Sequence, residues 1–450
     1  MKKSNRHLKN SSKRIDNNPR MFAYHLLHEA ATGSIVTDSL GDRIAESQLN
    51  EPDRRLAYDI VINCIRRRLT LDYLIHWYSN RDIDSIDLPV RAVLWIGFYQ
   101  LRYMDKIPPH AAVSESVETA KQVAGKGASG FVNAILRNCL RSPQTAEDRY
   151  SQLQSLEKLA FRESHPLWLI ERWSGSMDAD KLEAFCEFNN RKPPLVVRVH
   201  TANISVCAFA GQLSNCGVYY EKSPVHPDCF RIFGSYNVEH LPGYADGWFA
   251  VQDETTLRVI DRIDVRTGHS ILDMCAAPGG KTAYLAQQTG ITGRVVAVDS
   301  NKRRMRQLAD TISRLRMPNV TTVVADGTDY DALTKQSIMP GSFDRVVVDA
   351  PCSNTGVLRK RPEARWRLCT DDFARLADLQ KKLLNNAAEF VNKDGILLYS
   401  TCSIDREENE AVADSFISIN RSFEMLERTT FLPAQPTDPD GGFCAVFRKI

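Results

Sequence analysis

The chain has 450 residues, of which 43% are hydrophobic and 25% are charged, and its formal net charge at pH 7 is +3. These values are typical of a globular protein with room for two or three domains. No apolar run reaches the length needed to span a bilayer, and the amino terminus lacks the apolar core of a signal peptide. The sequence therefore argues against an exported or membrane-spanning chain and predicts a cytoplasmic protein, whereas the small net charge does not establish a nucleic-acid partner.

A basic tail and a set of helices are predicted for the amino-terminal third. Residues 1–19 are polar and rich in lysine and arginine, which is typical of a disordered tail, with or without a polyanionic partner. Residues 20–145 show helical spacing of apolar residues with short connections. About six helices and no strand pattern predict an all-α domain, in which Gly125, Gly127 and Gly130 interrupt one helix.

The middle of the chain has weaker signals. Residues 146–165 are polar and predict a linker, and residues 166–245 predict a small α+β region. Within that region, residues 195–201 alternate as a half-buried strand does, and residues 206–213 have the spacing of a short helix.

Apolar runs alternate with helical patterns over residues 246–450, which predicts a parallel, doubly wound α/β sheet of the Rossmann-like kind. The strands are predicted at 271–277, 294–299, 321–326, 343–352, 395–402 and 443–449. The main helices are predicted at 281–288, 301–315, 371–391 and 410–419. Ligands of such sheets bind at the carboxyl ends of the strands, so the residues that follow these strands are the candidates for a functional site.

The first of these strand ends is glycine-rich. The stretch ILDMCAAPGGKT, residues 271–282, predicts a buried strand that turns sharply into a helix. The helix amino terminus favours an anionic group, but the spacing is neither that of a phosphate-binding loop nor that of a dinucleotide fingerprint. By itself the turn therefore indicates only a small-molecule site, and a purely structural strand–helix turn is the alternative.

Three aspartates close the following strands. Asp299 follows the second strand, where an acid can accept hydrogen bonds from both ribose hydroxyls. Asp326 follows the third strand and Asp349 the fourth. Any one of them could simply cap a helix. A ribose-binding acid beside a glycine turn, without a pyrophosphate loop, fits S-adenosylmethionine better than NAD.

Two of the eleven cysteines, Cys352 and Cys402, follow strands at the same edge of the predicted sheet. Most lone cysteines are inert core residues, but two at one active edge are harder to explain in that way. A disulfide is disfavoured in a reducing compartment, and a zinc site would need two further ligands, so no metal is expected. The remaining interpretation is a thiolate nucleophile, as required to activate carbon 5 of a pyrimidine by addition at carbon 6. An acid near ring nitrogen 3 would help that addition, and Asp349 is the natural candidate.

Family resemblance is carried by seven motifs. DMCAAPGGKT, VVAVDSNKRR, VVADGTD, DAPCSNTGVLRKRPEARW and STCSIDREENE resemble those of the NOL/NOP2/Sun family of RNA (cytosine-5)-methyltransferases. HAAVSESVETAK and KGASGFVNAILRNCLR resemble a NusB-like RNA-binding helical domain. Together they make the chain similar to the RsmB (Sun/Fmu) type, which methylates 16S ribosomal RNA. The resemblance implies an RNA-binding role for residues 166–245 and a catalytic role for residues 246–450.

The resemblance also implies roles for single residues. It places Asp299 on the ribose of S-adenosylmethionine, and Asp326 and Asp349 also in the cofactor site. It makes Cys402 the covalent nucleophile and Cys352 the thiol that assists product release, the reverse of the assignment in DNA cytosine methyltransferases. Contacts to the cofactor are implied along the glycine turn, at Cys275, Ala276, Ala277, Pro278, Gly279, Gly280 and Lys281.

A substrate track is predicted after the Pro-Cys motif. Cations with one aromatic residue among them suit RNA phosphates and a stacked base, although a solvated helix face is the alternative. The predicted RNA-binding residues are Arg359, Lys360, Arg361 and Arg365. We expect a monomeric enzyme acting on 16S ribosomal RNA, free or in an assembling subunit; tRNA or another ribosomal RNA position, and a non-catalytic RNA-binding factor, remain alternatives.

Overall fold

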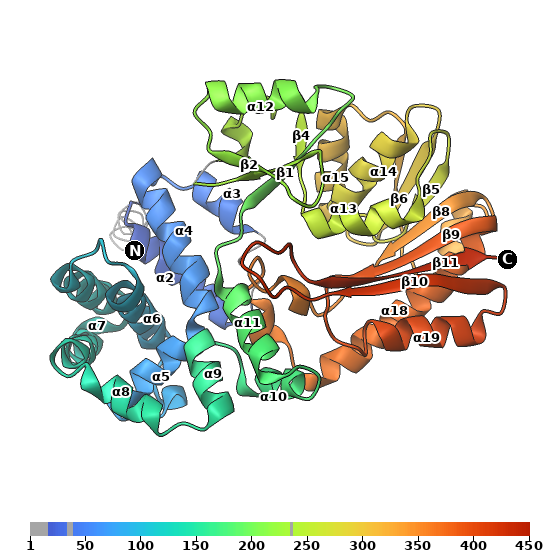
Figure 1. Cartoon of the computed structure of the whole chain (residues 1–450). Helices are drawn as coiled ribbons and strands as arrows, with labels where there is room; N and C mark the ends of the chain where they lie inside the picture. The colour runs from blue at the N-terminus through green and yellow to red at the C-terminus, as the bar shows by residue number, and fades with distance from the viewer. Residues whose placement is uncertain (1–16, 34–38, 235–236) are drawn as a thin grey trace, which may run out of the picture. The chain divides into compact units, whose positions relative to one another are not determined.

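The computed structural model describes residues 17–33, 39–234 and 237–450 (Figure 1). The chain forms two compact units, which we call the helical unit (Met1–Arg191 and Leu358–Arg367) and the sheet unit (Lys192–Val357 and Leu368–Ile450). Residues 1–16 of the predicted basic tail lie outside the described residues. Within the described residues, no helix combines the length and the apolar character required to cross a membrane.

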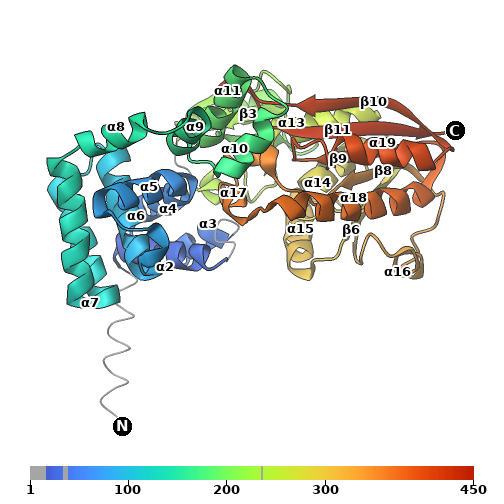
Figure 2. The same cartoon turned by 90° about the horizontal axis from the view of Figure 1, so that it is seen from below.

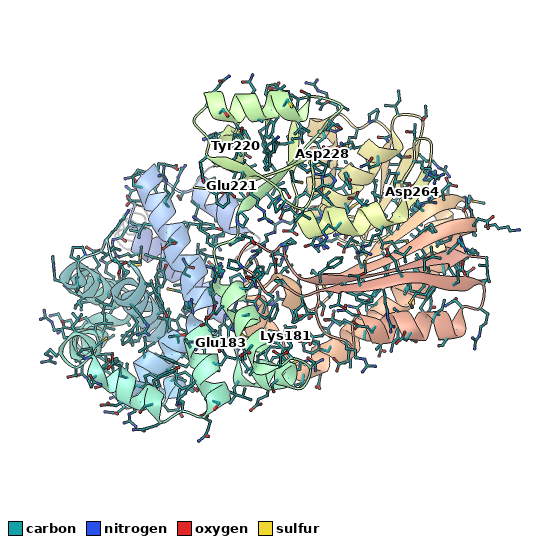
Figure 3. All side chains as sticks on the ribbon, in the orientation of Figure 1. Lys181, Glu183, Tyr220, Glu221, Asp228 and Asp264 are labelled. Carbon is teal, nitrogen blue, oxygen red and sulfur yellow. The ribbon has the colours of Figure 1, made fainter. Side chains whose placement is uncertain are left out.

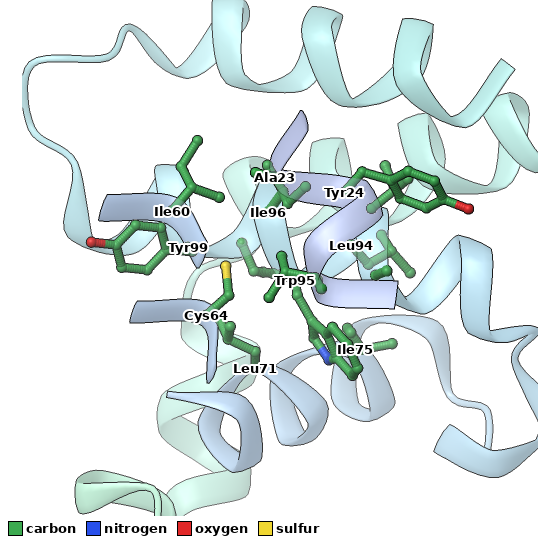
Figure 4. Close-up of a cluster of buried hydrophobic side chains, with 14 of the residues drawn as sticks. Ala23, Tyr24, Ile60, Cys64, Leu71, Ile75, Leu94, Trp95, Ile96 and Tyr99 are labelled. Carbon is green, nitrogen blue, oxygen red and sulfur yellow. The ribbon is translucent and has the colours of Figure 1, made fainter. Parts of the chain in front are cut away.

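Over the described residues the helical unit consists of helices, and most of them pack around one hydrophobic core. Figure 4 shows part of this core, where Ile60 and Cys64 of α4 lie near Trp95 and Ile96 of α6. The helices are α2 (Pro19–Ala31), α3 (Leu40–Ala45), α4 (Glu51–Arg66), α5 (Arg68–Ser79), the 3₁₀ helix η2 (Ile83–Ser85), α6 (Leu88–Tyr103), α7 (Pro109–Arg141), α8 (Gln144–Ser151), α9 (Ser155–Glu163), α10 (Leu167–Ser174), α11 (Ala179–Asn190) and α17 (Ala364–Arg367).

Two expectations for the helical unit need correction. The predicted linker, residues 146–165, is instead largely helical, because α9 buries an apolar face that includes Leu159 and Phe161, and Phe161 joins the core. The break in α7 is confirmed at Gly125, whose φ of 84° lies in the left-handed region that glycine tolerates. Gly127 and Gly130 do not interrupt the chain again and belong to the second half of α7.

A small antiparallel sheet opens the sheet unit. Its order is β2-β3-β1-β4, and Tyr220 and Glu221 lie on its edge strand β2 (Figure 3). Phe209 and Leu213 of α12 pack on its apolar face. The elements are β1 (Leu195–Val199), α12 (Val206–Asn215), β2 (Tyr220–Lys222), β3 (Cys229–Ile232), η3 (Val238–His240) and β4 (Phe249–Val251). The predicted strand and helix of this region are thus confirmed.

A seven-stranded sheet in the order β10-β11-β9-β8-β5-β6-β7 forms the rest of this unit. Its strands are β5 (Ser270–Asp273), β6 (Arg294–Asp299), β7 (Val320–Val324), β8 (Phe343–Asp349), β9 (Val391–Thr401), β10 (Phe423–Phe431) and β11 (Gly442–Lys449). The accompanying helices are α13 (Glu254–Ile260), η4 (Asp261–Ile263), α14 (Gly280–Thr289), α15 (Lys302–Leu315), α16 (Tyr330–Lys335), η5 (Thr355–Val357), α18 (Thr370–Phe390) and α19 (Glu410–Ile419).

Helices cover both faces of this sheet, as a Rossmann-like fold requires. Alternate residues point to opposite faces: Ile271 joins the core under α13, α14 and α15, and Leu272 joins the core under α18 and α19. Figure 2 shows α18 and α19 running along one face. The predicted fold class is therefore confirmed.

The sheet is mixed rather than wholly parallel, which corrects one expectation. The strands from β9 to β7 pair in parallel, but β11 pairs antiparallel with β9 and β10 pairs antiparallel with β11. No strand was predicted over β10, because its half-polar sequence FEMLERTTF lies at the sheet edge and lacks the continuous apolar run of a central parallel strand.

Candidate functional site

The glycine turn lies between β5 and α14 and is fixed by the two neighbouring strands. Met274 N donates to Val347 O of β8, and Ala276 N donates to Val298 O of β6, both at 2.9 Å. Gly279 has a φ of +108°, and a Cβ atom there would come within 2.9 Å of Leu308. Both the conformation and the close approach of α15 therefore require glycine at this position.

Asp299 holds this turn from the end of β6. Its Oδ2 accepts a hydrogen bond from Ala277 N at 3.2 Å, and its Oδ1 accepts one from Asn301 N at 2.8 Å. The residue is nearly buried, and each carboxylate oxygen keeps a free lone pair for a further donor. Such an acceptor-only group suits the hydroxyls of a ribose.

The polar atoms around the turn also fit the amino-acid end of S-adenosylmethionine. Buried Gln252 Nε2 has no hydrogen-bond partner among the described residues, and the Gln252 side-chain amide lies 3.9 Å from where a Cβ on Gly280 would stand. Asp273 Oδ1, at the end of β5, is a buried acceptor that also lacks a partner. An unpaired donor and an unpaired acceptor at one turn match a carboxylate and an ammonium group.

Asp326 has different surroundings from Asp299. It is exposed, and its Oδ1 accepts hydrogen bonds from Thr328 N at 2.9 Å and Thr328 Oγ1 at 2.8 Å. These contacts stabilise its own turn after β7, so the geometry gives this aspartate a structural role whether or not a cofactor is bound.

Asp349, at the end of β8, is paired with Lys281 of the glycine turn. Lys281 Nζ donates to Asp349 Oδ2 at 2.7 Å, and Ser400 Oγ donates to Asp349 Oδ1 at 2.9 Å. Burial alone would lower the pKa of Lys281, but the adjacent Asp349 carboxylate outweighs it and the pKa is raised. Both oxygens of Asp349 thus act as acceptors, and the proton donor of the pair is Lys281.

The two thiols that the sequence singled out meet at the strand ends. Cys352 Sγ lies 3.0 Å from Cys402 Sγ, and both cysteines are free and half-buried. The hydrogen bond with Cys402 and burial raise the pKa of Cys352 well above its usual value. Cys352 is therefore a neutral thiol at ordinary pH and can donate its hydrogen to the sulfur of Cys402.

Asn354 is a site residue that the sequence analysis did not single out. Its Nδ2 donates to Cys352 O at 2.8 Å, and its Oδ1 accepts from Cys402 Sγ at 3.3 Å. Its φ of 65° is left-handed, a conformation that asparagine adopts more readily than most residues. The only sign of this residue in the sequence is its position, two residues after the Pro-Cys motif.

Two of the four predicted RNA-binding cations are buried in the helical unit. Arg365 is 0% exposed and Arg359 is 3% exposed, and the Arg359 guanidinium lies 4.1 Å from the centre of the Phe188 ring. These two side chains are therefore inaccessible to RNA phosphates in this structure, which corrects the prediction for them. Lys360 is half-buried and Arg361 is exposed.

Arg365 instead caps the carboxyl ends of three helices. Its Nη1 donates to Ser164 O at 2.9 Å and to Arg66 O at 3.3 Å, and its Nη2 donates to Asn189 O at 3.3 Å. These carbonyls end or follow α9, α4 and α11, whose dipoles place partial negative charge there. Burial lowers the pKa of Arg365 to about 9, so the guanidinium stays charged at neutral pH.

Comparison with known families matches three segments of the chain. The model described as 16S rRNA methyltransferase RsmB/F matches residues 262–438, the NusB family model matches residues 17–141, and the RsmF/B-like ferredoxin-like domain matches residues 165–239. The last match shows that the small α+β region is ferredoxin-like.

Similar proteins extend over most of the chain. It is 33% identical to the probable ribosomal RNA small subunit methyltransferase B of Synechocystis sp. over 94% of this chain and 92% of the relative. It is 32% identical to the ribosomal RNA small subunit methyltransferase B of Salmonella arizonae over 87% of each chain. Among solved structures, PH0851 aligns with a TM-score of 0.76 and 26% identity, covering 89% of this chain and 91% of that one.

Proposed function

Because the chain belongs to the RsmB/F family of 16S rRNA methyltransferases, we propose that it methylates carbon 5 of a cytosine in 16S ribosomal RNA. The observation that carries the cytosine-5 chemistry is the pair of thiols 3.0 Å apart, at the same sheet edge as the glycine turn. The methyl donor is S-adenosylmethionine, which supplies an electrophilic methyl group. For a ribosomal RNA substrate, we propose that the protein acts in the cytoplasm.

Cys402 is the proposed nucleophile. Its thiolate adds to carbon 6 of the cytosine, the sulfur–carbon bond forms, and the ring electrons move toward nitrogen 3, which leaves carbon 5 nucleophilic. Once carbon 5 carries the methyl group, its proton leaves to water. The ring double bond then forms again as the bond to Cys402 breaks.

Cys352 is the proposed aid to that last step. As a neutral thiol within hydrogen-bond distance of Cys402, it can stabilise the departing thiolate. The contact between the two sulfurs supports a role for Cys352 beside the attacking thiol, since it places Cys352 Sγ 3.0 Å from Cys402 Sγ.

Asp349 is proposed for the nitrogen-3 edge of the base, together with Lys281. Addition of the thiolate makes nitrogen 3 negative, and a hydrogen-bond donor there lowers the barrier. Since both oxygens of Asp349 accept hydrogen bonds, the Lys281 ammonium is the source of positive charge in this pair.

Substrate binding follows from the same chemistry. A base inside a duplex cannot reach Cys402, so the target is an unstacked or single-stranded cytosine. Of the predicted cations, Lys360 and Arg361 keep their proposed role in RNA binding, because they are not buried in the helical unit.

Thiol variants of the full chain test the mechanism. With a 16S ribosomal RNA transcript and methyl-labelled S-adenosylmethionine, Cys402→Ala is expected to lower methylation at least ~1000-fold without trapping RNA. Cys352→Ala is expected to accumulate a protein–RNA adduct that survives denaturation. Bisulfite sequencing of the product locates the methylated cytosine, with a tRNA transcript as the control substrate. An adduct in Cys402→Ala instead of Cys352→Ala would reverse the two roles.

A further inference from the structure

Glu408 is a buried carboxylate whose partners belong to the loop that carries Cys352. Its Oε1 accepts a hydrogen bond from Ser353 N at 2.9 Å and one from Gln380 Nε2 at 2.9 Å. Its Oε2 accepts one from Ser353 Oγ. Burial raises the pKa of Glu408, and a carboxylate that is 0% exposed is costly to bury unless such donors compensate.

Glu408 and Gln380 together hold both sides of Cys352. Gln380 Nε2, buried on α18, also donates to Pro351 O at 2.9 Å. Pro351, before Cys352, is thus hydrogen-bonded to Gln380, and Ser353, after Cys352, is hydrogen-bonded to Glu408. The Gln380 and Glu408 side chains are in turn bonded to each other. The backbone of Cys352 cannot move away from Cys402 without breaking these buried hydrogen bonds.

The backbone of Glu408 belongs to the other thiol loop, six residues after Cys402. Its carbonyl accepts a hydrogen bond from Tyr399 OH on β9, three residues before Cys402. A second link joins the same loops, because Ser353 Oγ lies 3.1 Å from Ser403 Oγ, within hydrogen-bond distance. The side chain of Glu408 therefore reaches from the Cys402 loop to the Cys352 loop.

We propose that Glu408 is a positioning residue that keeps Cys352 against Cys402 and so controls release of the methylated base. The inference rests on the proposed function. No hydrogen bond joins Glu408 to either sulfur among the described residues; it acts directly on Ser353, and on Pro351 through Gln380. Loss of Glu408 is therefore expected to have the same kind of effect as loss of the Cys352 thiol.

Loss of the Glu408 hydrogen bonds is expected to slow release of the methylated base without preventing the attack of Cys402 on the base. Cys402 is also held independently of Glu408, since Gly356 N donates to Cys402 O at 2.9 Å and Thr401 Oγ1 donates to Asn409 Oδ1 at 2.6 Å. Without Glu408, Cys402 can still add to the base. Cys352 no longer stands beside the departing sulfur, so the covalent intermediate should persist.

The test compares Glu408→Ala, Glu408→Gln and Glu407→Ala in the full chain, with Cys352→Ala as reference. Since a misplacement of about 1 Å can cost ~100-fold, Glu408→Ala is expected to lower turnover at least ~10-fold and to accumulate adduct as Cys352→Ala does. Glu408→Gln should keep turnover within about threefold, because its amide can accept from Ser353 N and donate to Ser353 Oγ. The neighbouring exposed Glu407 is the matched control and should behave as wild type.

The affinity of Glu408→Ala for S-adenosylmethionine distinguishes a displaced Cys352 loop from a disrupted fold. Calorimetry should give S-adenosylmethionine affinities for Glu408→Ala within about twofold of wild type. Loss of turnover with no adduct, or with a parallel loss of cofactor affinity, would overturn the proposal. If Glu408→Ala does not fold, Ser353→Ala removes the hydroxyl contacts to Glu408 Oε2, Ser403 and Thr355 but keeps the backbone contact to Oε1, and it must show the same adduct at a lower level. If Cys352→Ala itself gives no adduct, it is the proposed function that fails.

Discussion

Asp299 and Asp326 follow neighbouring strands, yet their side chains differ in burial and in hydrogen-bond partners. Asp299 is nearly buried and holds the glycine turn through Ala277 N. Asp326 is exposed, and its carboxylate accepts hydrogen bonds from Thr328 in its own turn. The proposal that each contacts the cofactor therefore has more structural support for Asp299.

Substituting these two aspartates measures that difference. Asp299→Ala is expected to weaken S-adenosylmethionine binding at least about tenfold, since it removes a charged acceptor worth ~1.5–3 kcal/mol. Asp326→Ala is the matched variant, and we expect it to weaken binding less than Asp299→Ala does. Calorimetry on the full chain gives both affinities. Unchanged affinity in Asp299→Ala would contradict the ribose assignment.

Asp273 predicts a pH dependence of stability. Burial raises its pKa to about 7, although a hydrogen bond from Thr282 Oγ1 opposes this, and its ordinary value is 3.8. The folded state thus prefers the protonated form, and the stability this gives is complete below about pH 4 and is lost as the pH rises to about 7.

Asp273→Asn should remove this loss of stability at rising pH, since an amide stays neutral and can still accept a hydrogen bond from Thr282 Oγ1. Without cofactor, we expect the variant to unfold at a higher urea concentration than wild type at pH 8, by up to about 4 kcal/mol in unfolding free energy. At pH 4 the two proteins should be nearly equal. If the difference in unfolding free energy between the two proteins were the same at pH 4 and at pH 8, the raised pKa of Asp273 would be contradicted.

At the scale of elements, the segment Leu358–Arg367 behaves as a structural part of the helical unit. Trp366 Nε1 donates to Ile65 O at the end of α4, and Arg66 Nη2 donates to Arg359 O. With Arg365 at three helix ends, the segment satisfies carbonyls that would otherwise lack partners. The run of cations after the Pro-Cys motif predicts RNA binding, but the burial of Arg359 and Arg365 shows a role in packing for these two residues.

Arg365→Met tests that role. Leaving several buried carbonyls without a donor is expected to cost about 3 kcal/mol of unfolding free energy. Arg361→Met is the exposed control and should change stability by less than ~0.5 kcal/mol. Urea unfolding followed by fluorescence measures both. If Arg365→Met instead weakens RNA binding and leaves stability unchanged, Arg365 is an RNA contact after all.

At the scale of the whole molecule, the chain passes between its two units three times. It leaves the helical unit at Arg191, returns to it at Leu358 and leaves again after Arg367. The loop that carries Cys352 is therefore followed directly by a segment that folds with the helical unit. The ferredoxin-like match, residues 165–239, likewise extends across the division at Arg191.

Hydrogen exchange on the full chain checks this division. Amides of Leu358–Arg367 should share the opening free energy of α4, α9 and α11, because they belong to one cooperative unit. They should differ from β8 and α18, which flank the segment in sequence. Increasing urea while exchange is followed by mass spectrometry separates the two groups. Exchange of the segment together with β8 and α18 would contradict the division.

The order of elements and the thiol pair were determined by the sequence alone. Apolar runs alternating with helical patterns predict the Rossmann-like sheet, and parallel strands bring their carboxyl ends to one edge, so Cys352 and Cys402 are expected at that edge. The pairing of β8 with β9 then brings the two sulfurs to 3.0 Å. Local periodicity carries this information because each strand or helix buries a face that its own residues define.

Only the tertiary structure decided which charged residues are buried and which partners hold the thiols. Arg365 and Glu408 lie in polar stretches, and their burial depends on groups distant in sequence, the helix ends around Arg365 and the Ser353 loop around Glu408. A charged side chain can be buried only where donors or acceptors converge on it, and that convergence is set by the packing of whole elements. The antiparallel edge of β10 and β11 was likewise decided by pairing between strands, which periodicity does not specify.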